Sequence, residues 1–203
     1  MHVDDCLCAG QTEALKETIE LNKQHFGITV EDLNDYLSCD VKFNKSRTTA
    51  WIGQPHLVTK LKKTFHDKIK NLQKYKTPGT PGKGITRPSK DDKLLTKEEQ
   101  TLYRSGVGIL LFLIKYSRPD LSNVTRELAK CMDGATDAAM KELYRTIKFV
   151  IDTEDYGLKI KPIKSEDEEW QLVMFTDSDF GGDKETRISI MGYILYVLEV
   201  LVS

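Results

Sequence analysis

The stretch that most constrains the fold of this 203-residue chain is KTPGTPGKGITRPSKDDK, residues 76–93. It holds three prolines and three glycines. Proline lacks the backbone N–H that helices and inner strands need, and glycine loses much conformational entropy when it is ordered. Neither a helix nor a central strand can therefore pass through this stretch. We expect a linker or an extended crossing strand here.

The sequence before this stretch alternates between strand and helix patterns. In residues 1–9, apolar positions flank two carboxylates, which predicts a β-hairpin, and Thr12 is the expected N-cap of a helix over 12–26. Residues 36–53 alternate with the period of a strand around the polar turn NKSRTT and predict a second hairpin. A helix is expected over 55–75, where apolar residues recur on one side, namely Leu57, Leu61, Phe65, Ile69 and Leu72.

The sequence after the stretch predicts helices followed by strands. Thr96, with Glu99 three residues on, forms a capping-box pattern at the start of a helix that runs until Pro119. Two more helices are expected over 119–132 and 137–152. The strand GLKIKPI and a final pair of strands, in WQLVMFTDSDFGGD and RISIMGYILYVLEV, complete the chain. The whole pattern predicts an α+β protein.

Charge is distributed unevenly along the chain. The formal net charge is -1, yet residues 54–90 carry ten basic residues against one acidic residue, Asp67. Lysines that neutralise phosphates bind nucleic acid without regard to its sequence, so a lysine-rich helix here favours phosphate contact. The same pattern is also typical of an ordinary solvated helix face. The basic residues are Lys60, Lys62, Lys63, Lys68, Lys70, Lys74, Lys76, Lys83, Arg87 and Lys90.

Composition and cysteine spacing narrow the class of protein. The chain is 39% hydrophobic and 30% charged, as is ordinary for a folded globular protein. Cys6 and Cys8 form a C-x-C pair without the partners of a zinc site, so the four cysteines are expected to be packing residues in a reducing compartment. The longest apolar run, residues 107–114, is too short to span a bilayer, and no secretory signal is visible. We expect an intracellular protein, cytoplasmic or nuclear, that does not enter a membrane.

Two groups of carboxylates are candidates for chemistry. Asp4 and Asp5 lie at the tip of the first expected hairpin. Two-metal phosphoryl transfer needs carboxylates that hold divalent cations close together, and this pair would need a third carboxylate from elsewhere. Adjacent aspartates are also common in ordinary turns. A calcium loop that starts at Asp177 is excluded, because its fifth position is Gly181 and its twelfth is Ile188.

Several ordered motifs resemble the reverse transcriptase of copia-type retrotransposons, followed by the start of ribonuclease H. They are VDD before an amphipathic helix, YLSCDVKF, QPHLVTKL, KTPGTPG, LYRSGVGILLFLIKYSRPDLSNVTRELAKCM and FTDSDFGGDKETRISIMGY. The resemblance covers nearly the whole chain. It implies a piece of a Pol polyprotein truncated at both ends, in which neither the polymerase site nor the nuclease site has all of its carboxylates.

The resemblance also implies roles for particular residues. Asp4 and Asp5 correspond to the paired Mg²⁺-binding aspartates of the polymerase palm, although His2 stands where the family has tyrosine. Asp177 corresponds to an Mg²⁺-binding aspartate of ribonuclease H, and Trp51 would stack in the primer grip or pack across strands. Asp179 and Asp183 would be turn or supporting residues. The lysine-rich helix would belong to the thumb, with phosphate contacts from Lys60, Lys62, Lys63, Lys68 and Lys70.

The implied organisation has four parts. Residues 1–53 would end the palm, 54–90 would hold the thumb helix and the Pro/Gly linker, 91–156 the helical connection, and 157–203 an incomplete ribonuclease H start. The implied partners are an RNA template, a DNA primer, an RNA–DNA hybrid and deoxynucleotides, with the rest of the polyprotein needed for folding. We expect neither activity from the chain alone. The alternatives are a non-catalytic nucleic-acid-binding fragment and a decayed transposon remnant.

Overall fold

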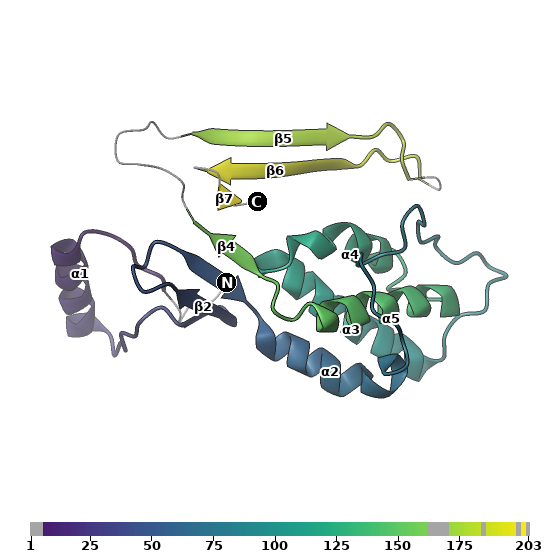
Figure 1. Ribbon diagram of the computed structural model, residues 1–203, viewed down its shortest axis with the longest axis horizontal. Helices are drawn as coiled ribbons and strands as arrows, with labels where there is room; N and C mark the ends of the chain where they lie inside the picture. Colours follow the sequence, from purple (N-terminus) through teal and green to yellow (C-terminus); the bar gives the residue numbers. More distant parts are fainter. Residues whose placement is uncertain (1–5, 162–170, 184–185, 198–199, 202–203) are drawn as a thin grey trace. The chain divides into compact units, whose positions relative to one another are not determined.

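The protein is an α+β chain, as the sequence predicts, and its elements are seen in a computed structural model (Figure 1). The structure describes residues 6–161, 171–183, 186–197 and 200–201. These residues form two compact units. The first comprises the described residues up to Val41 together with Gly53–Tyr156, and the second comprises Lys42–Ile52 with the described residues from Gly157 onward.

The core of the first unit is a cluster of packed helices, drawn side by side in Figure 1. They are α2 (Pro55–Ile69), α3 (Lys97–Tyr116), α4 (Ser122–Ala129) and α5 (Asp137–Asp152). A short 3-10 turn, Pro119–Leu121, leads into α4. Their inward residues are almost completely removed from water, and burial of such apolar area is the main favourable term in folding. Side chains with no exposed surface include Leu61, Phe65, Tyr103, Val107, Leu110, Leu128, Leu143 and Ile147.

The predicted capping box at the start of α3 is confirmed. The Thr96 hydroxyl accepts a hydrogen bond from the Glu99 N–H at 3.3 Å, and the Glu99 carboxylate accepts one from the Thr96 N–H at 3.0 Å. These two bonds satisfy backbone donors that the helix itself leaves unpaired. The predicted bounds of α5 are confirmed as well. The helix expected to reach residue 75 ends at Ile69, and the one expected to reach residue 132 ends at Ala129.

The proline- and glycine-rich stretch forms no helix or strand, as predicted, and it packs along the helical core. We call residues 76–93 the strap. Gly79 approaches α4 so closely that a Cβ atom there would lie 3.1 Å from Val124 Cγ2, which explains why a side chain is absent. Ile85 packs against the core, and its N–H donates to Glu127 at 3.1 Å. The strap is therefore an ordered part of the first unit.

The N-terminal elements of the first unit carry little burial. Helix α1 spans Thr12–His25, but Thr12 is its first helical residue, and Gln11 takes the N-cap position without a side-chain bond. The predicted cap at Thr12 is therefore wrong, and no residue of α1 is buried. Strand β1 (Asp35–Tyr36) pairs antiparallel with the start of β2 (Cys39–Phe43). Of the hairpin predicted over residues 1–9, residues 1–5 lie outside the described part and residues 6–9 form no strand.

The second predicted hairpin is confirmed by β2 and β3 (Ala50–Gly53), which lie on either side of a polar turn in the second unit. Asn44 organises this turn, because its side-chain oxygen accepts from the N–H groups of Thr48 and Thr49 at 2.8 and 3.1 Å. Strand β3 pairs antiparallel with β4 (Leu158–Ile160). The sheet has the strand order β1-β2-β3-β4.

The final strand pair is also confirmed. Strand β5 (Leu172–Ser178) pairs antiparallel with β6 (Met191–Val197) along its full length, and β7 (Val200–Leu201) follows beside β6. Every residue of β5 is exposed, so this sheet is held together chiefly by its backbone hydrogen bonds. Within the described ranges, no helix is long and apolar enough to cross a membrane.

Candidate nucleic-acid interface

Helix α2 presents two chemically different faces. Val58, Leu61, Phe65 and Ile69 recur at spacings of three and four residues and are all buried in the helical core. That spacing places them on one stripe of the helix, so the residues between them point away from the core. The outward residues include four of the lysines that the sequence singled out, and Lys70 follows directly after the helix, so the apolar stripe fixes which way these lysines face.

The five lysines differ in how they are paired. Lys62 forms an ion pair with Glu154, and Lys70 contacts Asp67 at 3.1 Å. Hydrogen bonds from Lys70 and His66 hold the pKa of Asp67 below its usual value, so this carboxylate stays negative beside Lys70. Three lysines are exposed, and their ammonium groups have no ion pair or hydrogen bond within the described ranges, namely Lys60, Lys63 and Lys68. These three are the cations of α2 that are available to a polyanion.

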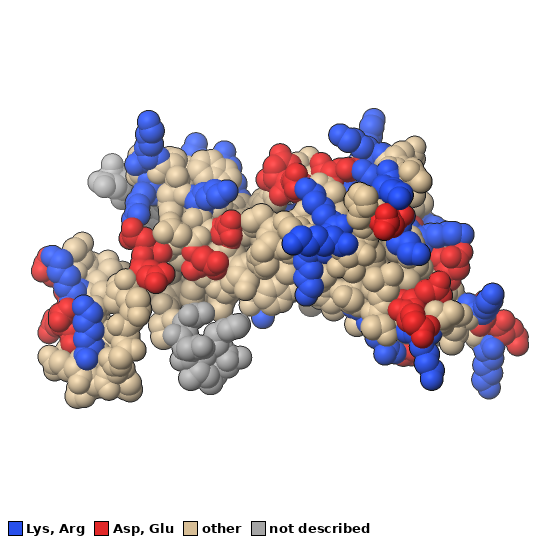
Figure 2. Space-filling model, turned by 90° about the horizontal axis from the view of Figure 1, so that it is seen from below, with Lys and Arg blue, Asp and Glu red and all other residues tan. Residues whose placement is uncertain are grey.

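One face of the molecule is mixed in charge. Figure 2 shows Lys and Arg side chains interspersed with Asp and Glu over one face of the molecule. This agrees with the formal net charge of -1. Attraction to phosphate would therefore depend on local groups of unpaired cations such as the three on α2.

Trp51 lies in β3 with 43% of its surface exposed. Its cross-strand partner is Lys159 on β4, whose ammonium lies 5.9 Å from the ring centroid. This cation–π contact is the cross-strand packing that the sequence left as one alternative. Because much of the ring remains open to solvent, stacking on a base stays a prediction.

The aspartates after the middle of β5 have separate environments. Asp177 lies opposite Gly192 on β6 and is exposed. Asp179 accepts hydrogen bonds from the N–H groups of Ile190 at 2.7 Å and Gly182 at 3.2 Å, so it organises the turn. Asp183 accepts from the N–H of Thr186 at 2.9 Å in the same connection. Asp179 and Asp183 thus make contacts within the turn. Among the described residues, the Asp177 carboxylate has no hydrogen bond or ion pair.

The remaining candidate ligands do not form a metal site in the described part of the chain. Asp4 and Asp5, the predicted Mg²⁺ ligands of the polymerase, lie outside the described residues, as does His2. Among the described residues, no three or more His, Cys, Asp or Glu side chains converge as metal ligands would. Cys39 and Cys131 are buried as predicted for packing residues, and burial raises the pKa of Cys39 to about 11. The packing prediction is wrong for Cys6 and Cys8, which are exposed.

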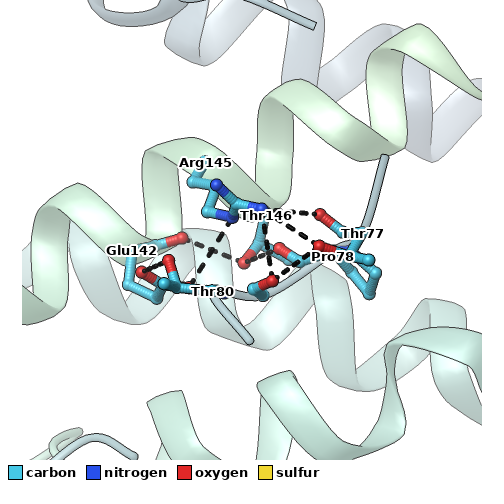
Figure 3. A network of polar contacts seen from close by, with 7 residues as sticks. Thr77, Pro78, Thr80, Glu142, Arg145 and Thr146 are labelled. Carbon is cyan, nitrogen blue, oxygen red and sulfur yellow. Dashed lines mark hydrogen bonds and ion pairs between the residues drawn. The ribbon is translucent and has the colours of Figure 1, made fainter. Parts of the chain in front are cut away.

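A polar cluster that the sequence pattern did not reveal joins α5 to the strap (Figure 3). Glu142, Arg145 and Thr146 lie on one side of α5 because they are three and four residues apart. Each contacts a strap residue more than 60 positions earlier in the chain. No periodic pattern signals such contacts, because their partners lie in irregular backbone.

Comparison with known proteins points to transposable elements. Over 199 residues, 97% of the chain, the sequence is 28% identical to the retrovirus-related Pol polyprotein from transposon RE2 of Arabidopsis thaliana, and 26% identical to that from transposon RE1. A 92-residue stretch, 45% of the chain, is 29% identical to secreted RxLR effector protein 161 of Plasmopara viticola and covers 62% of that protein. No protein-family model matches, and no solved structure matches.

The two Arabidopsis relatives, which match almost the whole chain, are Pol polyproteins of transposons. The expected resemblance to Pol polyproteins of copia-type retrotransposons is confirmed, because the similarity extends over nearly the whole chain rather than one motif. The chain is homologous to the Pol polyproteins of copia-type retrotransposons. It spans 13% of the length of the two Arabidopsis relatives.

Proposed function

We propose that this chain belongs to the reverse transcriptase and ribonuclease H region of a copia-type Pol polyprotein, and that α2 contacts the phosphates of the template–primer duplex. Two observations support the assignment to this region of the polyprotein. The homologous relatives are Pol polyproteins, and the ordered motifs of the chain follow the reverse transcriptase pattern. The observation that carries the proposed phosphate contact is the outward face of α2, where Lys60, Lys63 and Lys68 are exposed and unpaired among the described residues.

The physical argument for α2 starts from its orientation. Four buried apolar residues hold the helix against the core, so its lysines are presented on a rigid element instead of a loose tail. Each lysine that neutralises a phosphate releases condensed counterions, which makes binding strong at low salt and independent of base sequence. In a polymerase, an RNA–DNA hybrid or a primed template would supply the phosphates that these lysines neutralise.

In the same proposal, carboxylates bind Mg²⁺ for the two chemical steps. Asp4 and Asp5 would hold the ions of nucleotidyl transfer to deoxynucleotides, and Asp177 would hold an ion for hydrolysis of the RNA strand. Mg²⁺ prefers carboxylate oxygens, and Asp177 offers an exposed carboxylate in β5 next to Gly192, which has no side chain to cover it. Trp51 would contribute a partly exposed ring to stack on the primer.

The α2 proposal is tested by measuring the binding of an RNA–DNA hybrid over a salt series. We expect the triple variant Lys60→Glu, Lys63→Glu and Lys68→Glu to bind much more weakly, and the slope of log affinity against log salt to fall by about 3, one for each lost phosphate contact. Fluorescence anisotropy with a labelled hybrid gives both quantities.

The matched control changes three exposed lysines of the strap, Lys83, Lys90 and Lys93, to Glu. It alters the net charge by the same amount, so a change in overall charge alone would weaken both variants equally. The proposal predicts a clearly larger loss for the α2 variant. Equal losses, or a salt slope that the α2 variant leaves unchanged, would show that α2 is not the contact surface.

A further inference from the structure

The strap contains a tandem repeat, Thr77-Pro78-Gly79 followed by Thr80-Pro81-Gly82, that lies along α5 (Figure 3). Each threonine is followed directly by proline, which is the pattern that proline-directed protein kinases require at their acceptor. Both hydroxyls already make polar contacts with side chains of α5. The two contacts differ in the sign of the charge that each threonine meets.

Thr77 is exposed and meets a cation. Its hydroxyl accepts a hydrogen bond from Arg145 Nη2 at 3.1 Å and donates to the Gly79 carbonyl at 2.9 Å. Arg145 Nη2 also lies within hydrogen-bond distance of the carbonyls of Thr77 and Gly79, at 3.3 and 3.2 Å. Its guanidinium stacks on the Tyr75 ring at 4.1 Å from the centroid. The cation beside Thr77 is therefore held in place by several contacts.

Thr80 is half-buried and meets an anion. Its N–H donates to Glu142 Oε1 at 2.6 Å, and its hydroxyl donates to Glu142 Oε2 at 2.9 Å. Glu142 is only 7% exposed, so its negative charge is poorly screened by water. A phosphate on Thr80 would remove the hydroxyl donor and place a negative charge beside the buried carboxylate of Glu142, which would repel it.

We propose that Thr77 is a phosphorylation site of a proline-directed kinase and that Arg145 receives the phosphate, which fastens the strap to α5. In the transfer, Thr77 Oγ bonds to the γ-phosphorus of ATP, the bond from that phosphorus to the β,γ-bridging oxygen breaks, ADP leaves, and the hydroxyl proton passes to the base of the kinase. The product carries nearly two negative charges at pH 7 and three acceptor oxygens.

The existing contacts favour this outcome at Thr77. A guanidinium binds phosphate oxygens through paired N–H donors, and charge-assisted bonds of this kind are stronger than neutral ones. The carboxylate nearest to Arg145 is Glu142, 3.9 Å from Arg145 Nε, and Thr80 already satisfies both of its oxygens. Phosphate can therefore engage Arg145 while Glu142 keeps its hold on Thr80. The same modification at Thr80 would loosen the strap.

The test treats the full chain with a purified proline-directed kinase and ATP and locates the phosphate by mass spectrometry. We expect Thr77 to be modified at least about tenfold faster than Thr80, since Thr80 must first be released from Glu142 by local opening. The variant Thr80→Ala should keep the labelling, and Thr77→Ala should lose most of it. Preferred labelling of Thr80, or none at Thr77, would overturn the proposal.

A second measurement tests the role of Arg145. The melting temperature of the phosphorylated chain should exceed that of the untreated chain by about 3 °C, the shift that one or two charge-assisted bonds give a domain of this size. The same comparison within Arg145→Gln should show no gain, while Arg126→Gln, which removes an arginine of α4, should preserve it. A gain that survives in Arg145→Gln, or a lower melting temperature after phosphorylation, would contradict the proposal.

Discussion

The helical core and the β5–β7 sheet both contain large apolar residues but expose them to very different extents. In α2 and α5 the large apolar residues are buried, and Phe65 and Leu143 have no exposed surface. In β5 and the first half of β6 the apolar residues face solvent, with Phe175 61% and Met191 70% exposed. Burial drives the packing of the helices, whereas the strand pair is defined by a continuous backbone register.

Side-chain identity should therefore matter more for stability in the helical core than in the sheet. In this core α2 buries its apolar stripe against other helices, so its inward residues depend on partners from α3 and α5. A strand pair can keep its hydrogen bonds with many side chains, because the backbone groups make them. Substitutions of the same type should therefore change the free energy of unfolding by unequal amounts in the two regions.

The largest contrast is expected between two phenylalanines. Phe65→Ala removes a fully buried ring that contacts Tyr144 edge to face at 6.2 Å between centroids, and should lower the free energy of unfolding by about 3–5 kcal/mol. Phe175→Ala removes a mostly exposed ring and should cost about 1 kcal/mol or less. Urea unfolding measures both, followed by the helical circular-dichroism signal at 222 nm for Phe65→Ala and by tryptophan fluorescence for Phe175→Ala, since Trp51 lies in the same unit as β5. Similar losses for the two variants would mean that the sheet buries Phe175 in solution.

A second contrast lies within α3 and is expected to have opposite signs. A Cβ atom at Gly106 would lie 3.0 Å from both Leu143 Cδ2 and Phe65 Cζ, so Gly106→Ala should destabilise the core by about 1–3 kcal/mol. At Gly108 nothing lies within 4 Å of the same position, and Gly108→Ala should stabilise the helix by up to about 1 kcal/mol.

Thermal melts of the two variants measure this contrast. Close helix packing therefore accounts for the glycine at position 106 and not for the one at position 108. A rise in stability for Gly106→Ala would show that Phe65 of α2 and Leu143 of α5 can shift away from α3 at no cost in free energy. A fall for Gly108→Ala would indicate that its face of α3 is covered in solution.

The sequence predicts features of this structure that depend on residues close together in the chain, and it does not predict contacts between residues far apart. The capping box at Thr96 and the bounds of α5 were predictable, because caps and apolar periodicity act within a few residues. The pairing of Lys62 with Glu154, 92 positions away, was not, since nothing local marks it. The anchoring of the strap by Glu142 was missed for the same reason.

The candidate site shows the same division. That α2 carries lysines on its outer side follows from its apolar period, but which of them are free follows only from the tertiary contacts. The strap was correctly predicted to lack regular structure. Proline and glycine exclude helix and strand, but they do not indicate which conformation the backbone adopts instead. Whether such a segment is loose or fixed depends on partners elsewhere in the chain.

The smallest contrast concerns two tyrosines. The hydroxyl of Tyr103 is buried and donates to the Leu128 carbonyl at 2.7 Å, so Tyr103→Phe should cost about 1 kcal/mol at pH 7. Tyr193→Phe in β6, where the side chain is 54% exposed, should change stability by less than about 0.5 kcal/mol. Chemical denaturation at neutral pH measures both, and an equal cost would mean that the Tyr103 bond adds nothing to the core.

Alkaline pH should reverse the sign at Tyr103. Burial raises the pKa of Tyr103 well above its ordinary value, so the unfolded chain releases this proton before the folded chain does. The stabilisation is complete below about pH 10, the value of an unperturbed tyrosine, and is lost by about 1.4 kcal/mol per pH unit above it. Phenylalanine has no such proton, so Tyr103→Phe should become the more stable protein between about pH 11 and 12. If the two unfolding curves instead stay parallel from pH 7 to 12, the Tyr103 hydroxyl reaches solvent, and the contrast between a dry helical core and an exposed sheet fails at this residue.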